Sequence, residues 1–275
     1  MSRPLRSKLA QETVAISEAG HYTGPDGSEV QFEAAIREAV AATRCHSLDT
    51  TAETAGFART AQTKLEVTDE TTIAALQRLH SEPGGHLACL NFASAKNPGG
   101  GSLGGSEAQE ESLARSSALY RCLLAAPEYY ERNRKCRNAL YLDQAIWSPS
   151  VPFFRDDTGA LLNAPICASV ITAPAPNAGA VAANEQARMN EVTPTLHRRA
   201  AFVLALAAQR GVRRLVLGAW GCGVFRNNPR VVAQTFAGLL CGPSAFANTF
   251  DEVVFAIFDR SADTAVLCAF REALT

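Results

Sequence analysis

Five short apolar runs, separated by segments with a helical pattern, constrain the fold of this chain more than any other feature. Nearly every residue in them is apolar, which is typical of strands buried on both faces of a sheet. Apolar runs that alternate with helices indicate an α/β fold with a mixed or mostly parallel sheet covered by helices. The predicted strands are His86 to Ala93, Ala139 to Ile146, Ile166 to Ala173, Arg214 to Trp220 and Glu252 to Phe258.

Two of the intervening helices have recognisable starts. Asn228 is the expected N-cap of a helix with Pro229 at its first position. Thr193 and Pro194 repeat this pattern in a second helix, which is expected to stop at Gly211. Polar N-caps and a proline at the first helical position both suit a helix start, because proline lacks only an amide hydrogen that would be unpaired there.

The N-terminal part of the chain lies outside this alternation. Its segments SKLAQETVAIS, EVQFEAAIREAVAATRC and DETTIAALQRLH all have a helical pattern. We therefore predict that residues 1–80 form an N-terminal helical extension, packed on a core of residues 81–275 in a single domain. Asp157, Thr158 and Gly159, between two apolar stretches, predict a hairpin inserted in the main fold.

Charge argues against a generic nucleic-acid binder. The 275 residues include 27 acidic and 26 basic ones, and the basic residues are scattered. Proteins that bind nucleic acid without specificity usually carry a basic stripe. A polyanionic ligand must therefore be held locally rather than by a broad electrostatic field, and direct nucleic-acid binding is not expected.

The cysteines and the apolar runs also bear on cell compartment. Eight cysteines occur singly with no C-x-x-C pair, which indicates a reducing cytoplasm and no metal centre. Cysteines in runs such as LACLNF and PICASVIT are expected to be buried. No run reaches the ~18 apolar residues of a membrane span, and the N-terminus has no apolar signal-peptide core. We expect a cytoplasmic monomer without membrane contact.

A glycine-rich stretch, NPGGGSLGGSEAQEESLARSS, begins at Asn97. Ser106 and Gln109 fit a capping box, which predicts that a helix starts at Ser106. Acidic residues in its first turns could simply interact with the helix dipole. Five glycines in the preceding loop favour a second interpretation, because such a loop lets a ligand approach the backbone. Adjacent helical residues point about 100° apart, so one of Glu110 and Glu111 is expected to act and the other to support it.

A second glycine loop lies in RRLVLGAWGCGVFRNNP, between a predicted strand and a helix. This arrangement can cradle phosphate with backbone amides. It lacks the sequence fingerprints of nucleotide-binding loops, so the alternative that it only connects a strand to a helix stays open. Two loops beyond the carboxyl ends of one sheet would face a common crevice. Phe225 and Phe258 could lie against a ligand or pack in the core, and Asp259 could bind an amine or cap a helix.

These motifs resemble the poly(ADP-ribose) glycohydrolase family. The triplet Gly99 to Gly101, followed after seven residues by Gln109 to Glu111, is similar to the family signature. LNFASAKNPGGG, VITAPAPN and GAWGCGVFRNNP look like its bacterial-type branch. The resemblance covers about residues 87–258. It implies a macrodomain-like three-layer α/β/α fold with a mixed central sheet, which agrees with the alternation of strands and helices.

The resemblance also implies site residues. Glu111 would be the catalytic acid, and Glu110 and Gln109 would position the ribose. The remaining expected substrate contacts surround the ribose, wrap the diphosphate or lie near adenine: Gly99, Gly100 and Gly101 at the ribose, with Asn97 nearby; Gly221, Cys222, Gly223, Val224 and Phe225 at the diphosphate, with Phe225 against the ribose; Asn177 and Phe258 at the adenine end.

The implied reaction is hydrolysis of the ribose–ribose bond of poly(ADP-ribose), from chain ends, releasing ADP-ribose without metal or other cofactor. Glycoside cleavage needs an acid that protonates the leaving oxygen and a base that activates water. Glu111 is expected to do both, with burial and Glu110 helping it hold a proton. The alternatives are a non-catalytic ADP-ribose reader and a hydrolase of mono-ADP-ribosyl groups or O-acetyl-ADP-ribose. A reader needs the phosphate loop but no acid at the helix start.

Overall fold

A central mixed sheet organises the protein in a computed structural model that describes residues 1–48 and 62–274. Seven strands of the described residues form this sheet in the order β3-β6-β7-β5-β8-β9-β4. Strands β7, β5, β8, β9 and β4 run parallel, whereas β6 is antiparallel to both of its neighbours. Their bounds are β3 Arg44–Ser47, β4 Lys64–Thr68, β5 Leu87–Phe92, β6 Gln144–Arg155, β7 Leu161–Ala173, β8 Arg214–Leu217 and β9 Glu252–Ala256.

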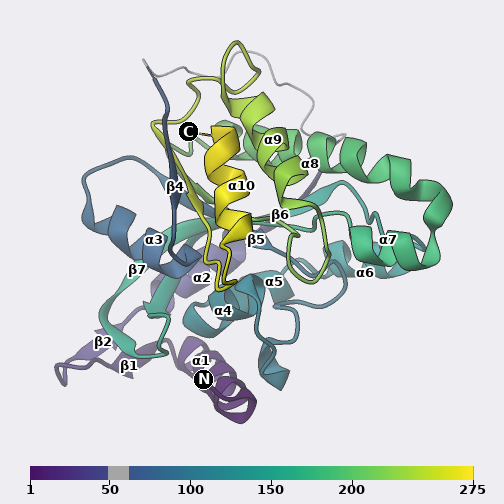
Figure 1. The fold of residues 1–275 in the computed structure, drawn as a ribbon. Coiled ribbons are helices and arrows are strands. Elements are labelled where there is room, and N and C mark those ends of the chain that lie inside the picture. Colours follow the sequence, from purple (N-terminus) through teal and green to yellow (C-terminus); the bar gives the residue numbers. More distant parts are fainter. Residues whose placement is uncertain (49–61, 275) are drawn as a thin grey trace.

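Helices cover both faces of the sheet, which gives the three layers expected of a macrodomain-like fold. One face packs on α8 (Met189–Gln209), α9 (Pro229–Leu240) and α10 (Ala265–Leu274), as Figure 1 shows. The opposite face packs on a second group of helices: α2 (Glu33–Ala42), α3 (Thr72–Ser81), α4 (Gln109–Ser116), α5 (Leu119–Leu124) and α6 (Pro127–Lys135).

The apolar runs of the sequence correspond to strands buried on both sides. In β5, Ala88 and Leu90 belong to one core cluster, while Leu87 and Cys89 belong to the other. This alternation follows from the two-residue period of a strand. Strands β8 and β9 are likewise buried along their whole length, so the prediction of an α/β fold with a doubly covered sheet is confirmed.

The N-terminal region contributes more than helices. Helix α1 (Arg3–Ala19) and helix α3 agree with the prediction, but Glu29–Gln31 forms strand β2, which pairs with β1 (His21–Thr23). Strands β3 and β4 form the two edges of the central sheet. Both are only partly buried and carry charged residues, so they lack the apolar run that marks the inner strands.

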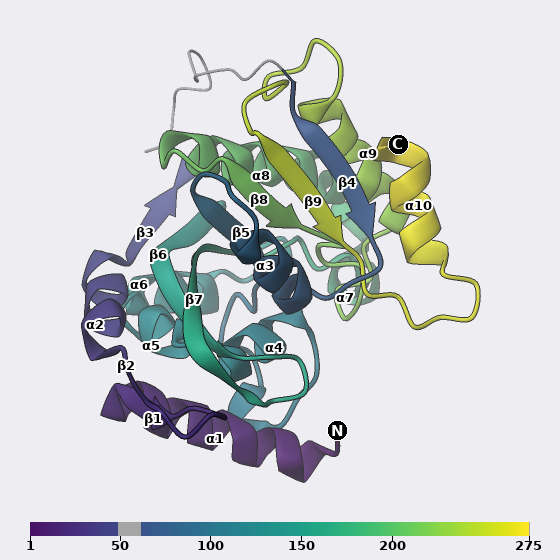
Figure 2. The same ribbon diagram turned by 90° about the vertical axis from the view of Figure 1, so that its left-hand side faces the viewer.

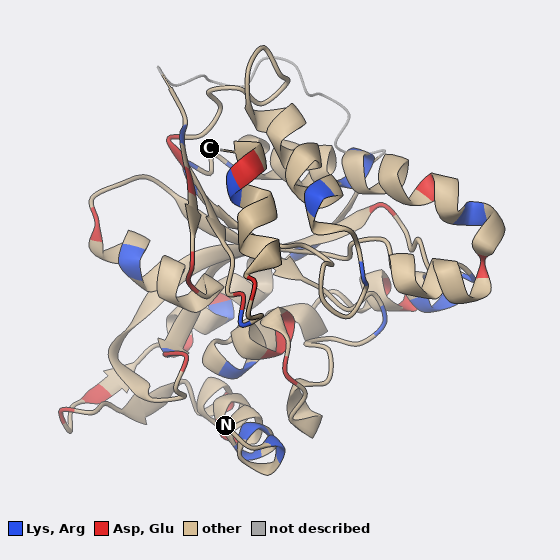
Figure 3. Ribbon diagram, viewed as in Figure 1, with Lys and Arg blue, Asp and Glu red and all other residues tan. Residues whose placement is uncertain are grey.

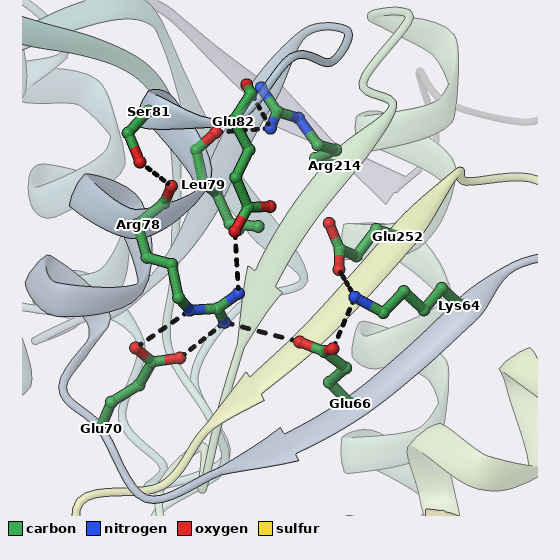
Figure 4. Close-up of polar contacts among 9 residues, drawn as sticks. All are labelled: Lys64, Glu66, Glu70, Arg78, Leu79, Ser81, Glu82, Arg214 and Glu252. Atoms are coloured by element: carbon green, nitrogen blue, oxygen red, sulfur yellow. Dashed lines mark hydrogen bonds and ion pairs between the residues drawn. The ribbon is translucent and has the colours of Figure 1, made fainter.

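A polar network fixes the β4 edge to its neighbours. Arg78 of α3 pairs with Glu66 of β4 and also with Glu70 and Glu82. Lys64 bridges Glu66 to Glu252 of β9, at 2.6 and 2.8 Å. Figure 4 shows these side chains converging across β4, β9 and α3, with Arg214 reaching the carbonyls at the end of α3. The network holds in place the start of α3, which borders the site described below.

The predicted start of one strand was wrong. The strand predicted from Ala139 to Ile146 begins only at Gln144, because Arg199 binds the carbonyl oxygens of Leu140 and Tyr141 and takes them out of strand pairing. The strand then continues to Arg155 and turns through Asp156–Gly159 into β7, so the predicted hairpin is present as the end of two central strands.

Helix α8 begins at Met189, one turn before the predicted start, and Pro194 lies inside it. Thr193 is therefore not its N-cap. The short helix α7 (Ala178–Asn184) and the turn Gln186–Arg188 lead directly into α8. Helix α9 begins as predicted, with the Asn228 side chain accepting a hydrogen bond from the amide of Arg230.

Charged residues and cysteines follow the sequence prediction in most respects. Figure 3 shows basic residues distributed over many elements and interspersed with acidic ones. Cys89 is buried as expected, but Cys167 is exposed, because in the middle of β7 its side chain lies on the opposite face from those of its buried neighbours Ile166 and Ala168. No helix within the described ranges is both long enough and apolar enough to traverse a bilayer.

Candidate active site

A cavity of about 770 Å³ lies between the two glycine loops. The loops follow β5 and β8, which are parallel neighbours in the sheet, and the segment after β9 adds a third wall. The carboxyl ends of these strands therefore meet at one edge, as expected for ligand sites in α/β sheets. The first turn of α4 lies against this edge and brings two carboxyl groups into the cavity.

The carboxyl groups of Glu110 and Glu111 have different environments. Glu110 is 3% exposed, and its oxygens accept hydrogen bonds from the Ser94 amide at 2.6 Å and the Asn91 side chain at 3.3 Å. Burial raises the pKa of Glu110 to about 8, and the charge of Glu111 adds to the shift. Glu111 is 9% exposed, and Oε1 accepts from the Gly101 amide at 2.9 Å. The expectation of two unequal carboxylates agrees with this geometry.

The first glycine loop packs directly on these carboxyl groups. Gly100 has φ +59°, and a Cβ atom there would lie 2.4 Å from Oε1 of Glu111 and 3.1 Å from Oε2 of Glu110. A side chain at this position would therefore displace the pair. The glycine is required by both the backbone conformation and the close approach.

The predicted capping box is absent. Helix α4 begins at Gln109, and its N-cap, Ala108, provides no side-chain hydrogen bond. The Gln109 side chain instead reaches the sheet, accepting from the Phe92 amide at 2.8 Å and donating to the Leu90 carbonyl at 2.8 Å. The carboxyl end of β5, beyond its last residue paired with β8, offers these two backbone groups to the Gln109 side chain. Gln109 therefore anchors α4 to the end of β5 while it also lines the cavity.

The second loop presents free backbone amides to the cavity. Gly221 has φ +73°, and the Asn227 side chain donates to its carbonyl oxygen at 3.2 Å and to that of Pro176 at 2.8 Å. Within the described part of the chain, the amides of Gly223, Val224 and Phe225 donate to no protein acceptor. Three successive amides without a protein acceptor, on residues that line the cavity, suit an anion such as a diphosphate.

The structure brings together most of the predicted site residues. Two of them, Gly99 and Asn177, lie outside the cavity lining: Gly99 shapes the loop turn with φ +63°, and Asn177 caps α7 through the Ala180 amide. Those that line the cavity are Asn97, Gly100, Gly101, Gln109, Glu110, Glu111, Gly221, Cys222, Gly223, Val224, Phe225 and Phe258.

Aromatic and acidic residues after β9 also border the cavity. Phe258 is 52% exposed and lies 4.5 Å from the guanidinium carbon of Arg260, so its ring is free of the core. Phe225 contacts Tyr141 at a ring distance of 5.9 Å. Asp259 accepts hydrogen bonds from the Val266 and Leu267 amides, so the capping interpretation of this residue is confirmed.

Sequence reasoning missed the contribution of α1 and the β6–β7 hairpin. Arg6 and Leu9 of α1 and Asp156 and Asp157 of the hairpin line the same cavity as the carboxyl pair. Figure 2 shows α1 lying beside α4 and the end of this hairpin. Nothing in the local pattern of α1 marks this role, because it depends on contacts with residues about 100 positions further along the chain.

The fold and the site together define a macrodomain-like enzyme. Its features are a mixed sheet between helical layers, a loop of free amides and a buried carboxyl pair at a helix start. The model of the microbial-type poly(ADP-ribose) glycohydrolase catalytic domain matches residues 10–156. The chain therefore belongs to this family. No curated protein matches the chain.

Solved structures agree with this assignment. Poly(ADP-ribose) glycohydrolase from Thermomonospora curvata is 46% identical, with a TM-score of 0.94 over 98% of this chain and 99% of that one. A structure of it bound to the inhibitor ADP-HPD is 47% identical, with a TM-score of 0.91 over 97% and 98%. The Deinococcus radiodurans enzyme in complex with ADP-ribose is 47% identical, with a TM-score of 0.81 over 86% and 96%.

Proposed function

We propose that this chain hydrolyses the ribose–ribose bond of poly(ADP-ribose) and releases ADP-ribose, with Glu111 as general acid and base. The observation that carries the proposal is the contact between the carboxyl pair and Gly100–Gly101, across one cavity from the free amides of the second loop. A ribose against the first loop would place its anomeric carbon beside Glu111. Its diphosphate would then extend toward the second loop.

The two carboxyl groups have different parts in the proposed proton transfer. The pKa of Glu110 is about 8, so this buried group is mainly neutral at pH 7 and supports the site without giving up its proton. Glu111 is the member tied to the loop that would surround the ribose. In its acid form Glu111 gives its own proton to the leaving 2′ oxygen as the bond to the anomeric carbon breaks. Glu111 then accepts a proton from the water that adds to this carbon. This sequence meets the need of glycoside hydrolysis for an acid followed by a base.

The diphosphate is held without a cluster of basic residues. Gly223, Val224 and Phe225 line the cavity and have amides without a protein acceptor, and these amides bind the diphosphate in the proposed complex. Such donors recognise phosphate at short range and need no broad positive field. A protein with 26 basic and 27 acidic residues can therefore take a polyanionic substrate.

The exposed end of the cavity accommodates the adenine. Phe258 and Arg260 lie there as a stacked pair, and the Phe258 ring offers a flat apolar surface. Flat aromatic rings suit stacking on a base. Cleavage from chain ends follows if one terminal ADP-ribose unit fills the cavity and the rest of the polymer leaves past Glu111.

The test is incubation of the wild type and Glu111→Gln with poly(ADP-ribose), with product lengths followed by chromatography. Free ADP-ribose from the first time points, formed by the wild type alone, supports chain-end glycohydrolase activity. Oligomers of intermediate length at early times contradict chain-end cleavage. If the wild type leaves the polymer intact but still binds ADP-ribose in calorimetry, the protein is a non-catalytic ADP-ribose reader.

A further inference from the structure

Helix α1 binds the first glycine loop through three side chains. Arg6 and Ser7 lie three and four residues after Arg3, so both lie on the side of the helix that carries Arg3. Each side chain donates a hydrogen bond to the carbonyl oxygen of a different loop residue, and the three acceptor residues are consecutive. The pairs are Ser7 to Leu103 at 2.6 Å, Arg3 to Gly104 at 2.9 Å and Arg6 to Gly105 at 2.8 Å.

The contact between α1 and the loop leaves no room for a side chain at Gly105. Gly105 has φ +74°, and a Cβ atom there would lie 2.2 Å from the carbonyl oxygen of Arg3. Glycine therefore allows both the backbone conformation and the close approach of the helix. The loop and the helix are therefore closely packed at this position.

Arg6 has a second role at the same place. Its guanidinium pairs with the carboxylate of Glu107 at 2.7 Å, two residues before α4 begins. The Arg6 side chain is 13% exposed, and the residue lines the same cavity as Glu111. Arg6 thus ties the end of the glycine loop to the segment that leads into the catalytic helix.

The contacts of Arg3, Arg6 and Ser7 with residues 103–105 form a clamp on the loop. A short chain of hydrogen bonds connects this clamp to the carboxyl pair. The amide of Ser106, the residue after Gly105, donates to the Gly101 carbonyl at 3.1 Å. The Gly101 amide in turn donates to Oε1 of Glu111 at 2.9 Å. A displacement of the loop at Gly105 is therefore transmitted to the carboxylate through only two hydrogen bonds.

We propose that α1 is a positioning element of the active site, with Arg6 as its principal positioning residue. The inference rests on the proposed function, since it assigns Arg6 a role in the reaction at Glu111. A loop with five glycines has a large conformational entropy when free. Contacts that hold it in one conformation keep Glu111 in place before substrate binds, and small displacements at a reacting centre are costly in rate.

The experiment compares Arg6→Ala with Lys8→Ala. Lys8 lies on the same helix, carries the same charge and is 73% exposed, so it is a matched control. Each variant is assayed on poly(ADP-ribose) and on an ADP-riboside with a small aryl leaving group. Binding of ADP-ribose is measured by calorimetry. Amide hydrogen exchange of residues 97–106 is followed by mass spectrometry.

For Arg6→Ala we expect kcat to fall about tenfold to a hundredfold on both substrates. KM and the ADP-ribose Kd should stay within about twofold of the wild type. Exchange in residues 97–106 should become faster. Arg6→Lys should recover part of the loss, because lysine keeps the charge and can donate to Gly105 or pair with Glu107. Lys8→Ala should match the wild type throughout.

Several outcomes overturn the proposal. An unchanged kcat in Arg6→Ala would show that Arg6 does not position the active site. A loss confined to the polymer means that Arg6 contacts the leaving unit, and a rise in KM alone means that it binds substrate. If Arg6→Ala does not fold, Ser7→Ala removes one of the three carbonyl contacts and receives the same measurements. If the wild type is inactive on both substrates, the proposed function is rejected. Amide hydrogen exchange of residues 97–106 still shows in that case whether Arg6 holds the loop.

Discussion

Oε1 of Glu111 accepts a hydrogen bond of 2.9 Å from the Gly101 amide, so the glycine loop that would receive the ribose also orients the carboxylate. Glu110, the preceding residue, accepts hydrogen bonds from the Ser94 amide and the Asn91 side chain. One carboxyl group is thus hydrogen-bonded to the glycine loop and the other to residues in and just after β5. This division explains how two adjacent residues of one helical turn can have different chemical roles.

Replacement of Glu111 by Gln should strongly reduce turnover and spare binding. The amide keeps the shape of the side chain but cannot deliver or accept the proton, a loss of about a hundredfold to ten-thousandfold in kcat. Affinity for ADP-ribose, measured by calorimetry, should stay near that of the wild type. Glu38→Gln, an exposed change on α2, is the control. Loss of binding together with turnover would give Glu111 a structural role.

Replacement of Glu110 by Gln should change how stability depends on pH. The pKa of Glu110 is raised from 4.5 to about 8 in the folded protein, so the folded state binds more protons than the unfolded state between these values. The stability that this group contributes is therefore complete below about pH 4.5 and is lost as the pH rises through about 8.

Urea unfolding between pH 5 and 9 measures this effect. The free energy of unfolding of the wild type should fall across this range more steeply than that of Glu110→Gln, by an amount on the order of a few kcal/mol. Glu131→Gln, an exposed change on α6, should keep the slope of the wild type. Parallel curves for wild type and Glu110→Gln would contradict a buried, protonated Glu110.

A methyl group at Gly100 should inactivate the enzyme. At φ +59° alanine is strained by about 1–2 kcal/mol, and its Cβ atom would meet Oε1 of Glu111 at 2.4 Å. We expect loss of turnover beyond the loss of stability measured by thermal unfolding. The matched control is Gly104→Ala in the same loop, where a Cβ atom meets nothing within 4 Å. Equal activity of the two variants would refute the packing of the loop on the carboxyl pair.

A methyl group at Gly221 should weaken ligand binding. A Cβ atom there would lie 2.4 Å from the Asn227 side chain and 2.6 Å from Cβ of Ala175, and φ is +73°. Distortion of the loop moves the three free amides, so the ADP-ribose Kd should rise about tenfold or more, or about 1.4 kcal/mol. Gly238→Ala on α9 has open space and should leave calorimetric binding unchanged. Unaltered affinity in Gly221→Ala would place the diphosphate elsewhere.

Much of the site was predictable from local sequence. The buried strands β5, β8 and β9 have continuous apolar runs, and the glycine loops follow β5 and β8 directly. The carboxyl pair, the positive φ angles at Gly100 and Gly221 and the N-cap at Asn228 all involve residues close in sequence. Patterns of this kind predict structure well because their physical cause is short-range.

The sequence by itself determined the layered α/β fold, the two loops and the presence of two unequal carboxyl groups, because periodicity, glycine content and helix geometry are local properties. Only the tertiary structure decided that Arg44–Ser47 and Lys64–Thr68 form the sheet edges, that Gln109 binds β5 instead of capping its own helix, and that α1 holds the catalytic loop. Each of these depends on which polar partners distant segments offer one another. Arg6 and Gly105 are 99 residues apart, and no local pattern in the sequence records their contact.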